Sequence, residues 1–139
     1  MILASEHQVR ITYSETDQMG FVYHGNYASF YERGRVEMLR TQGMTYRDME
    51  GAGVAMPVLK LESKFIKPIF YDELITIKTI LLEIKGSRIF FDFEISNEKG
   101  DLCNLGSVGL VFVDTKTFRP CNPPENFMTL LAPYMNKEN

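Results

Sequence analysis

The sequence has little of several features that mark well-known classes of protein. It has two cysteines, Cys103 and Cys121, in neither a CxxC nor a zinc-binding spacing, so we expect two buried thiols in a reducing compartment. No run of about 18 apolar residues occurs, which argues against a transmembrane helix. The first residues have neither a basic stretch nor a long apolar core, so they do not resemble a signal peptide. These absences together predict a cytoplasmic protein.

An excess of basic residues is also absent. The net charge is −3, so nucleic acid and anionic membranes are poor candidates for the main partner, although a local cationic patch could still hold a small phosphorylated ligand. No P-loop and no GxGxxG motif occurs. Two histidines are present, and His7, His24 and Asp17 lack the spacing of metal ligands. We therefore expect neither a metal nor a separate cofactor.

The residues that are present predict an α+β fold. A chain of 139 residues with 45% hydrophobic content fits one domain with one core, over residues 1–139. Alternating residues predict strands at 7–13, 54–65, 73–85, 88–96 and 102–114, with a bulge near Thr79 and Ile80. Helices are predicted at 25–42, at 45–51 and after 122–125. The order is a strand, one long helix, a meander of four strands and a short helix.

The long predicted helix has one apolar stripe, formed by Tyr27, Phe30, Tyr31, Gly34 and Met38. Gly34 in mid-helix costs up to about 1 kcal/mol against alanine, which close approach to a packed surface would explain. The charged residues away from this stripe, Arg33, Arg35 and Glu37, are expected to face solvent or a second subunit.

The segment ahead of this helix, YSETDQMGFVYHGNY, combines an acid, a glycine and a histidine. With the helix it resembles the 4-hydroxybenzoyl-CoA thioesterase family of hotdog-fold acyl-CoA thioesterases, and most closely the subgroup whose bacterial members are associated with the Tol-Pal system. The matching positions are Tyr13, Asp17, Gly20, Val22, Tyr23, His24, Asn26, Tyr27, Glu32, Arg33 and Arg35. Two further segments are similar to the family, KFIKPIFYDEL from Lys64 to Leu74 and KGSRIFF from Lys85 to Phe91.

The resemblance implies a hotdog fold, a five-stranded antiparallel sheet wrapped around one helix, and hydrolysis of an acyl-CoA thioester. Asp17 would act as the nucleophile or as the general base, two roles that the sequence does not separate. Backbone N–H groups of His24 and Gly25, at the start of the helix, would stabilise the oxyanion. The His24 imidazole could orient Asp17 or water, and Tyr13, at the expected end of the first strand, could hydrogen-bond the acid.

The remaining candidate residues would bind the substrate. Gly20 allows a tight turn or close approach of the ligand, Asn26 could cap the helix, and Phe21, Tyr23 and Met56 could line the acyl pocket. The coenzyme A phosphates would be held first by Lys85, Ser87 and Arg88, and second by Lys64 and Lys67. Coenzyme A enters as part of the substrate. The family implies a homodimer or homotetramer with the site between subunits.

Two alternatives remain at this point. An acyl carrier protein thioesterase would use the same residues, although carrier proteins are acidic and the negative net charge argues mildly against them. A non-catalytic protein that binds acyl thioesters would be expected to have lost Asp17, Gly20 or His24, and all three are present.

Overall fold

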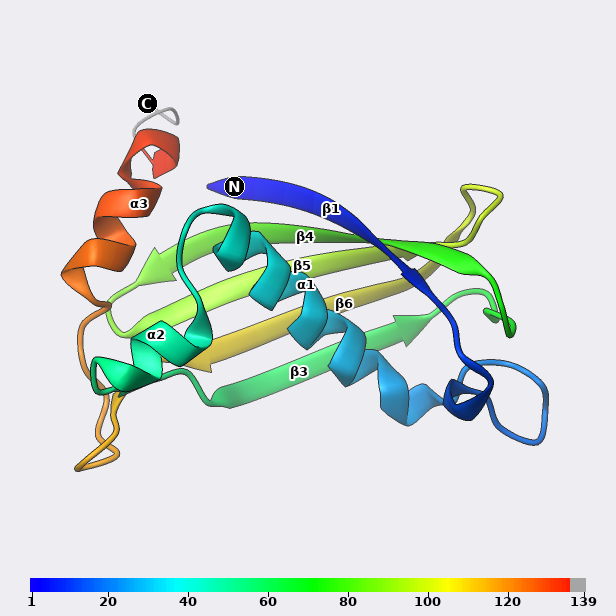
Figure 1. Ribbon diagram of the computed structural model, residues 1–139, viewed down its shortest axis with the longest axis horizontal. Coiled ribbons are helices and arrows are strands. Elements are labelled where there is room, and N and C mark those ends of the chain that lie inside the picture. Colours follow the sequence, from blue (N-terminus) through cyan, green and yellow to red (C-terminus); the bar gives the residue numbers. More distant parts are fainter. Residues whose placement is uncertain (136–139) are drawn as a thin grey trace.

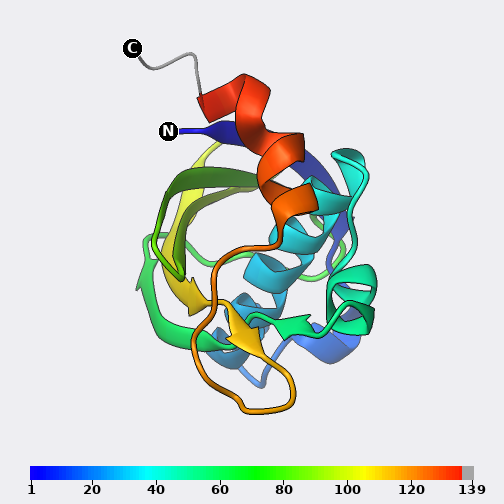
Figure 2. The same ribbon diagram turned by 90° about the vertical axis from the view of Figure 1, so that its left-hand side faces the viewer.

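A curved antiparallel sheet wraps around one long helix in the computed structural model, which describes residues 1–135 (Figures 1 and 2). The helix is α1 (Tyr27–Thr41). The sheet has the strand order β1-β4-β5-β6-β3. Its strands are β1 (Leu3–Arg10), β3 (Val58–Phe65), β4 (Leu74–Lys85), β5 (Arg88–Ser96) and β6 (Leu102–Val111). The predicted α+β class and five-stranded antiparallel sheet are confirmed.

The core lies between α1 and the concave face of the sheet. Strand residues alternate between the two faces, so β4 and β5 direct Ile75, Ile77, Phe91 and Phe93 toward the helix, and each of these is at most 1% exposed. The helix contributes its apolar stripe from the other side, and the ring of Tyr31 stacks on Phe93 with the ring centroids 4.7 Å apart. The stripe read from the sequence is therefore the buried face of the helix.

Gly34 is the point of closest approach between helix and sheet. A Cβ atom built on Gly34 would collide with Thr79 Oγ1 and would lie 3.2 Å from Phe93 Cε1. Thr79 is fully buried, and its hydroxyl has no hydrogen-bond partner within the described residues. The expected close approach at Gly34 is confirmed.

We expect Gly34→Ala to destabilise the protein by about 1–2 kcal/mol, because overpacking costs more than the roughly 1 kcal/mol gained in helix propensity. Thr79→Ala removes the clashing, unpaired hydroxyl and should change stability little by itself. The double variant should then recover the loss caused by Gly34→Ala. Urea unfolding of the three variants measures this coupling, and a double variant no more stable than Gly34→Ala would contradict it.

The predicted meander of four strands is wrong. Strands β4, β5 and β6 do pair in sequence order, but β3 pairs with β6. Their seven paired positions extend from Val58 opposite Leu110 to Phe65 opposite Asn104. Strand β1 pairs with β4 on the other side. Neighbouring strands in a sequence often pair, but the local pattern of a strand does not specify its partner. The result is that β3 forms an edge of the sheet.

Several element boundaries also differ from those predicted. Strand β1 begins and ends earlier than 7–13, so Tyr13 lies beyond it. The strand predicted at 54–65 is divided at Pro57 into β2 (Val54–Ala55) and β3. The strand predicted at 102–114 is divided into β6 and β7 (Val113–Asp114). Strand β2 pairs with β7 in a separate small sheet. The bulge in β4 lies between Leu81 and Glu83. The long helix begins at Tyr27 rather than Gly25, after a short 3-10 turn.

Two shorter helices cover one end of the sheet. Helix α2 (Tyr46–Gly51) begins after Thr45, whose hydroxyl accepts a hydrogen bond from the Asp48 N–H at 3.0 Å. Helix α3 (Glu125–Met135) buries Phe127 and Leu131. Arg35 on α1 is only 5% exposed, so it does not face solvent, the first of the two predicted surroundings. The side chain lies under α2, where its Nε donates to the Tyr46 hydroxyl at 3.2 Å.

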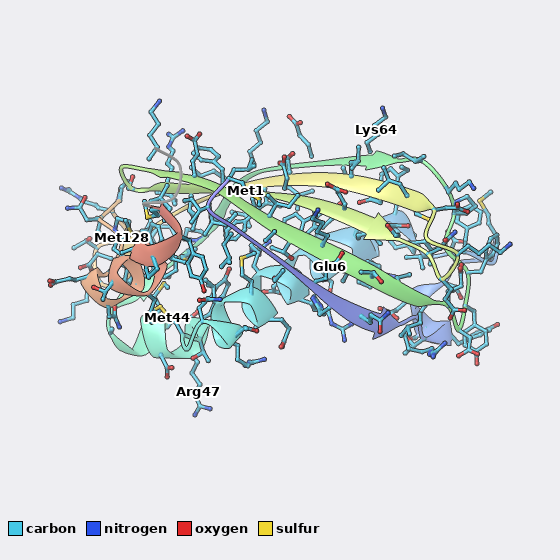
Figure 3. The ribbon with its side chains drawn as sticks, turned by 90° about the horizontal axis from the view of Figure 1, so that it is seen from above. Met1, Glu6, Met44, Arg47, Lys64 and Met128 are labelled. Carbon is cyan, nitrogen blue, oxygen red and sulfur yellow. The ribbon has the colours of Figure 1, made fainter. Side chains whose placement is uncertain are left out.

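The β3 edge is exposed and carries apolar residues among the charged residues Lys60, Glu62 and Lys64. Val58, Leu59, Leu61 and Phe65 are between 40% and 55% exposed, and β6 is the strand with which β3 pairs. Viewed from above, Lys64 on this strand projects away from α1 (Figure 3). Natural proteins usually cover or charge a long apolar edge because its free backbone groups pair readily with another strand.

Candidate active site

The acid of the sequence motif lies in a tight loop. A short 3-10 helix, η1 (Tyr13–Glu15), follows β1, and the chain then reverses between Asp17 and Phe21. The Asp17 N–H donates to the Phe21 carbonyl at 3.0 Å, and the Gly20 N–H donates to the Asp17 carbonyl at 3.0 Å. Gly20 has φ +87°, a conformation that favours glycine. The turn predicted at Gly20 is confirmed.

The Asp17 carboxylate is half-buried and only partly engaged. Its Oδ1 atom accepts a hydrogen bond from the Met19 N–H at 2.9 Å, which is a local turn contact. The other carboxylate oxygen has no hydrogen-bond partner among residues 1–135. One oxygen is therefore held in place by the loop while the other is free to meet a ligand or a water molecule.

The start of the helix presents unpaired backbone donors. The chain enters α1 through η2 (His24–Asn26), in which the Asn26 N–H donates to the Tyr23 carbonyl at 2.9 Å. The N–H groups of His24 and Gly25 have no acceptor in the part of the chain that the structure describes. Such groups carry the positive end of the helix dipole, so they suit an anionic oxygen.

Asn26 joins the acid-bearing loop to this helix start. Its Nδ2 atom donates to the Glu15 carbonyl at 2.7 Å, and the Tyr23 N–H donates to the same carbonyl at 2.9 Å. The side chain of Asn26 makes no capping hydrogen bond, so the predicted cap is wrong. The side chain instead fixes the position of η1 relative to η2.

Asp17 and His24 line one pocket of about 380 Å³. Phe21, predicted as a lining residue, is part of it. The other walls come from the loop, α1 and the end of β3, and consist of Met19, Val22, Tyr27, Phe65, Ile66, Lys67 and Pro68. Burial raises the pKa of Tyr27 to about 12, and Cys103 and Tyr31 add to the shift. The site is thus a largely apolar pocket with a carboxylate and helix-start donors at its wall.

Five predicted residues of the motif are not among those that line this pocket: Tyr13, Gly20, Tyr23, Gly25 and Asn26. Tyr13 is 76% exposed and packs edge-to-face against Tyr71, with the ring centroids 5.5 Å apart, and it makes no hydrogen bond to Asp17 within the described residues. Tyr23 packs its ring against the imidazole of His24 at 4.4 Å. A Cβ atom at Gly25 would lie 2.5 Å from Tyr23 Cε2, so glycine leaves room for that ring.

The candidates for coenzyme A binding divide between the two ends of the sheet. Lys85, Ser87 and Arg88 lie at the β4–β5 turn, at the opposite end from the Asp17 loop (Figure 1). Met56 lies at that far end as well, in a second pocket between α1, α2 and β3. Lys67 lines the Asp17 pocket, and its Nζ is paired with the Asp101 carboxylate at 3.0 Å. Within one chain, therefore, Asp17, Phe21, His24 and Lys67 lie in one pocket. Met56, Lys85, Ser87 and Arg88 lie at the other end of the sheet.

Several lining residues were not predicted as site residues, although the sequence contained a signal for some of them. Phe65, Ile66 and Pro68 belong to the segment KFIKPIFYDEL, which resembles the family, but nothing in its pattern shows that it runs beside the Asp17 loop. Tyr27 was assigned to the helix core, where it is 4% exposed and packs against Phe65 at 5.0 Å. It serves the core and the pocket wall together.

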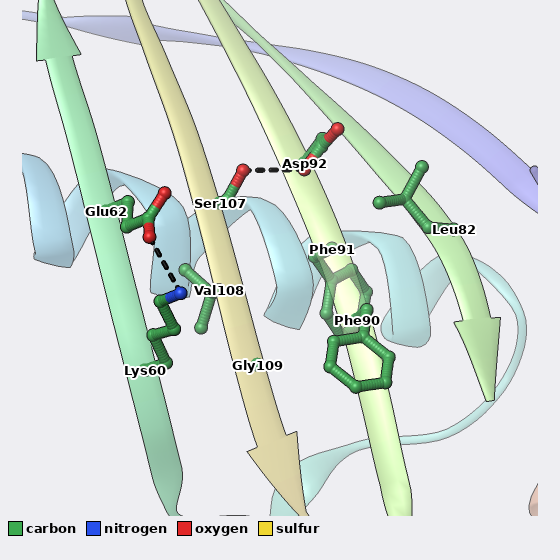
Figure 4. Close-up of a pocket in the computed structure, with 9 residues that line it drawn as sticks. All are labelled: Lys60, Glu62, Leu82, Phe90, Phe91, Asp92, Ser107, Val108 and Gly109. Atoms are coloured by element: carbon green, nitrogen blue, oxygen red, sulfur yellow. Dashed lines mark hydrogen bonds and ion pairs between the residues drawn. The ribbon is translucent and has the colours of Figure 1, made fainter. Parts of the chain in front are cut away.

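Another pocket, on the convex face of the sheet, is a weaker candidate. Figure 4 shows Lys60, Glu62, Asp92 and Ser107 on this face, with α1 behind the sheet. Lys60 pairs with Glu62 at 2.9 Å, and Ser107 donates to Asp92 at 2.8 Å. Because these polar groups already satisfy one another, none is directed at a ligand. Among residues 1–135 no cluster of histidine, cysteine and acidic side chains could hold a metal ion.

Known proteins share both this fold and this sequence pattern. Residues 11–131 match the family described as the Thioesterase-like superfamily. The putative acyl-CoA thioesterase YneP of Bacillus subtilis is 34% identical over 116 residues, 84% of each chain. The acyl-CoA thioester hydrolase YbgC of Escherichia coli is 32% identical over 120 residues, 86% of this chain and 90% of that one. A DHNA-CoA thioesterase from Staphylococcus aureus superposes with TM-score 0.91 at 33% identity, over 96% of this chain and 91% of that one.

The fold and the relatives define a hotdog-fold thioester hydrolase. The chain belongs to the Thioesterase-like superfamily. In the part of the chain that the structure describes, no helix is both long enough and apolar enough to cross a membrane.

Proposed function

We propose that the protein is an acyl-CoA thioesterase that hydrolyses an acyl-CoA to the free acid and coenzyme A. The observation that carries this proposal is the pocket lined by both Asp17, whose carboxylate is only half engaged, and His24, at the helix start where the N–H groups of His24 and Gly25 are unpaired among the described residues. Thioester hydrolysis needs a base or nucleophile and a set of donors for the developing oxyanion. The pocket supplies both, and YneP and YbgC are named for this reaction.

In the proposed reaction the thioester carbonyl oxygen accepts hydrogen bonds from the two helix-start N–H groups. Asp17 either removes a proton from the attacking water or attacks the carbonyl carbon itself, giving an anhydride that water then hydrolyses. The carbon–sulfur bond breaks as the tetrahedral intermediate collapses and expels the thiolate of coenzyme A. The thiolate is balanced by a proton from the water molecule, delivered by Asp17 in the general-base route and released on hydrolysis of the anhydride in the other. The apolar walls, formed by Phe21, Tyr27 and Phe65, would shield the reacting carbonyl from bulk water.

The complete site is proposed to form between two subunits. The exposed β3 edge, with Val58, Leu59, Leu61 and Phe65 on it, suits antiparallel pairing with the β3 strand of a second copy, which would extend the sheet across a two-fold axis. This pairing sets the end of one β3, beside Asp17, opposite the start of the other. Lys85, Ser87 and Arg88 of the partner subunit then come from the far end of its sheet toward the site. The division of candidates between the two ends of one chain supports this arrangement.

The direct test is release of free thiol from a panel of acyl-CoAs that differ in chain length and aromatic content. We expect turnover of at least one member, and lower turnover of the matching acyl carrier protein thioester. Preference for the carrier protein would favour that alternative. Tight binding of acyl-CoA without any thiol release would overturn the enzymatic proposal.

The role of His24 can be divided between its ring and its backbone. We expect His24→Pro to lower kcat by about 10²–10³, because it removes one oxyanion donor. Proline is tolerated at the first position of a helix, and Tyr23 before it is extended with ψ 134°, as a residue before proline requires. His24→Ala keeps the N–H and should retain most of the activity. Equal losses in both variants would instead assign the catalytic role to the imidazole.

A further inference from the structure

Arg35 is a buried arginine without an acidic partner. Its side chain lies on α1 at 5% exposure, its Nε donates to the Tyr46 hydroxyl, and no carboxylate lies within 4.0 Å of its guanidinium in the described chain. Burying a charge without pairing it is costly. The remaining guanidinium N–H groups make no hydrogen bond or ion pair with another described residue, although Glu32 and Glu50 line the same pocket.

Arg35 lines a pocket of about 260 Å³ at the start of β3. Its polar groups are Arg35, Tyr46, Glu32 and Glu50. Its apolar wall is formed by Met49 and by the segment from Val54 to Val58. Burial raises the pKa of the Tyr46 hydroxyl, an effect that Arg35 opposes, so this hydroxyl stays protonated at neutral pH. A pocket with an apolar wall and polar groups at one side fits a ligand that is apolar along its length and carries oxygen at its end.

The balance of charge in the pocket favours a neutral oxygen group. Arg35 offers N–H donors, whereas the carboxylates of Glu32 and Glu50 offer acceptors and would repel a second carboxylate. A hydroxyl group is both acceptor and donor. It could accept from Arg35 and donate to Glu32 at the same time, which neither a methyl group nor a carboxylate could do.

The location of the pocket relates it to the proposed reaction. On its own chain, it lies at the start of β3, whereas the Asp17 pocket lies at the end, beside Phe65. Antiparallel pairing of two β3 edges sets Val58 of one subunit opposite the Phe65 end of the other. In the proposed dimer, the Arg35 pocket of one subunit would therefore lie near the Asp17 pocket of the other.

We propose that the Arg35 pocket of one subunit binds the far end of the acyl group whose thioester is held at Asp17 of the other, and that it selects acyl groups with a terminal hydroxyl. This inference rests on the proposed thioesterase function and on the two-subunit site. Arg35 is then a specificity residue that contacts the substrate remote from the reacting carbonyl.

The test uses pairs of acyl-CoAs with equal carbon count, one with and one without a terminal hydroxyl, over a range of chain lengths. When the acyl chain is long enough to span the two pockets, we expect the wild-type enzyme to favour the hydroxylated acyl-CoA by about tenfold or more in kcat/KM. We expect Arg35→Met to abolish this preference. Tyr46→Phe, a milder change, should reduce it. Arg33→Met, an exposed arginine on the same helix, is the matched control and should leave the preference unchanged.

A purely structural role for Arg35 predicts a different result. Arg35→Met would then lower kcat/KM equally for both members of each pair, and this outcome would overturn the inference. Turnover by wild type without a hydroxyl preference at any length would also overturn it, while leaving the thioesterase proposal intact. Failure of wild type to hydrolyse any acyl-CoA would instead contradict the proposed function. If Arg35→Met does not fold, the comparison is decided by Tyr46→Phe.

Discussion

Asp17→Asn is expected to lower kcat for acyl-CoA hydrolysis by about 10³-fold, because asparagine can neither accept a proton nor attack a carbonyl, and proton transfer by a positioned group contributes about 10²–10⁴. The amide oxygen can still accept the hydrogen bond that the Met19 N–H donates to Asp17 Oδ1. The loop should therefore keep its shape, and the loss should be in kcat rather than in folding or in KM.

The measurement is steady-state thiol release together with the thermal unfolding midpoint. Asp92→Asn is the matched control, because Asp92 lies on the opposite face of the sheet and its contact with Ser107 needs only an acceptor. We expect Asp92→Asn to behave as wild type. Equal residual rates in wild type and Asp17→Asn would remove Asp17 from the mechanism.

A mixed dimer of two inactive variants is expected to regain activity. Asp17→Asn lacks the acid, and Lys85→Ala/Arg88→Ala should lose at least about tenfold in kcat/KM if these side chains hold the phosphates of coenzyme A. When each chain carries one of these changes, one of the two shared sites contains only wild-type groups. The mixed dimer, isolated through two different affinity tags, should then show about half of the wild-type activity, since the two-fold axis creates two equivalent sites.

The converse arrangement is the control. A dimer of one wild-type chain and one chain carrying all three substitutions has the same composition but no intact shared site, so it should be nearly inactive. If the site lay within one chain, the two results would be exchanged: the triple-variant dimer would be about half active, and the first mixed dimer nearly inactive. This comparison tests the two-subunit site independently of the identity of the substrate.

The sequence predicted the local parts of the site better than the distant ones. Asp17, Phe21 and His24 are close in the chain, and a tight turn at Gly20 followed by a helix brings them to one pocket. The involvement of Phe65 could not be predicted in the same way, because it depends on which strand β3 pairs with. That choice is made by the packing of the whole sheet rather than by the alternation within β3.

Arg35 shows a second limit. Its position off the apolar stripe correctly indicates that it does not face the sheet, but helix periodicity cannot show that α2 folds back over this side of α1. The buried face of α1 itself was predictable, since Phe30, Tyr31 and Met38 repeat at helical spacing, and each is at most 1% exposed. The residue pattern of a helix such as α1 does not show that a later element, here α2, will bury one of its side chains.

The distance between the two ends of the sheet has a consequence for how the activity arises. The acid and the proposed phosphate-binding turn lie at opposite ends of a stiff, continuous sheet, so no hinge motion within a chain could unite them. If the site forms between two subunits as proposed, a newly made subunit would be unable to cleave thioesters until it met a second one. At low subunit concentration, the rate of thioester hydrolysis would then rise more steeply than in proportion to the concentration of the protein. Isolated chains would therefore leave the cellular coenzyme A thioesters intact.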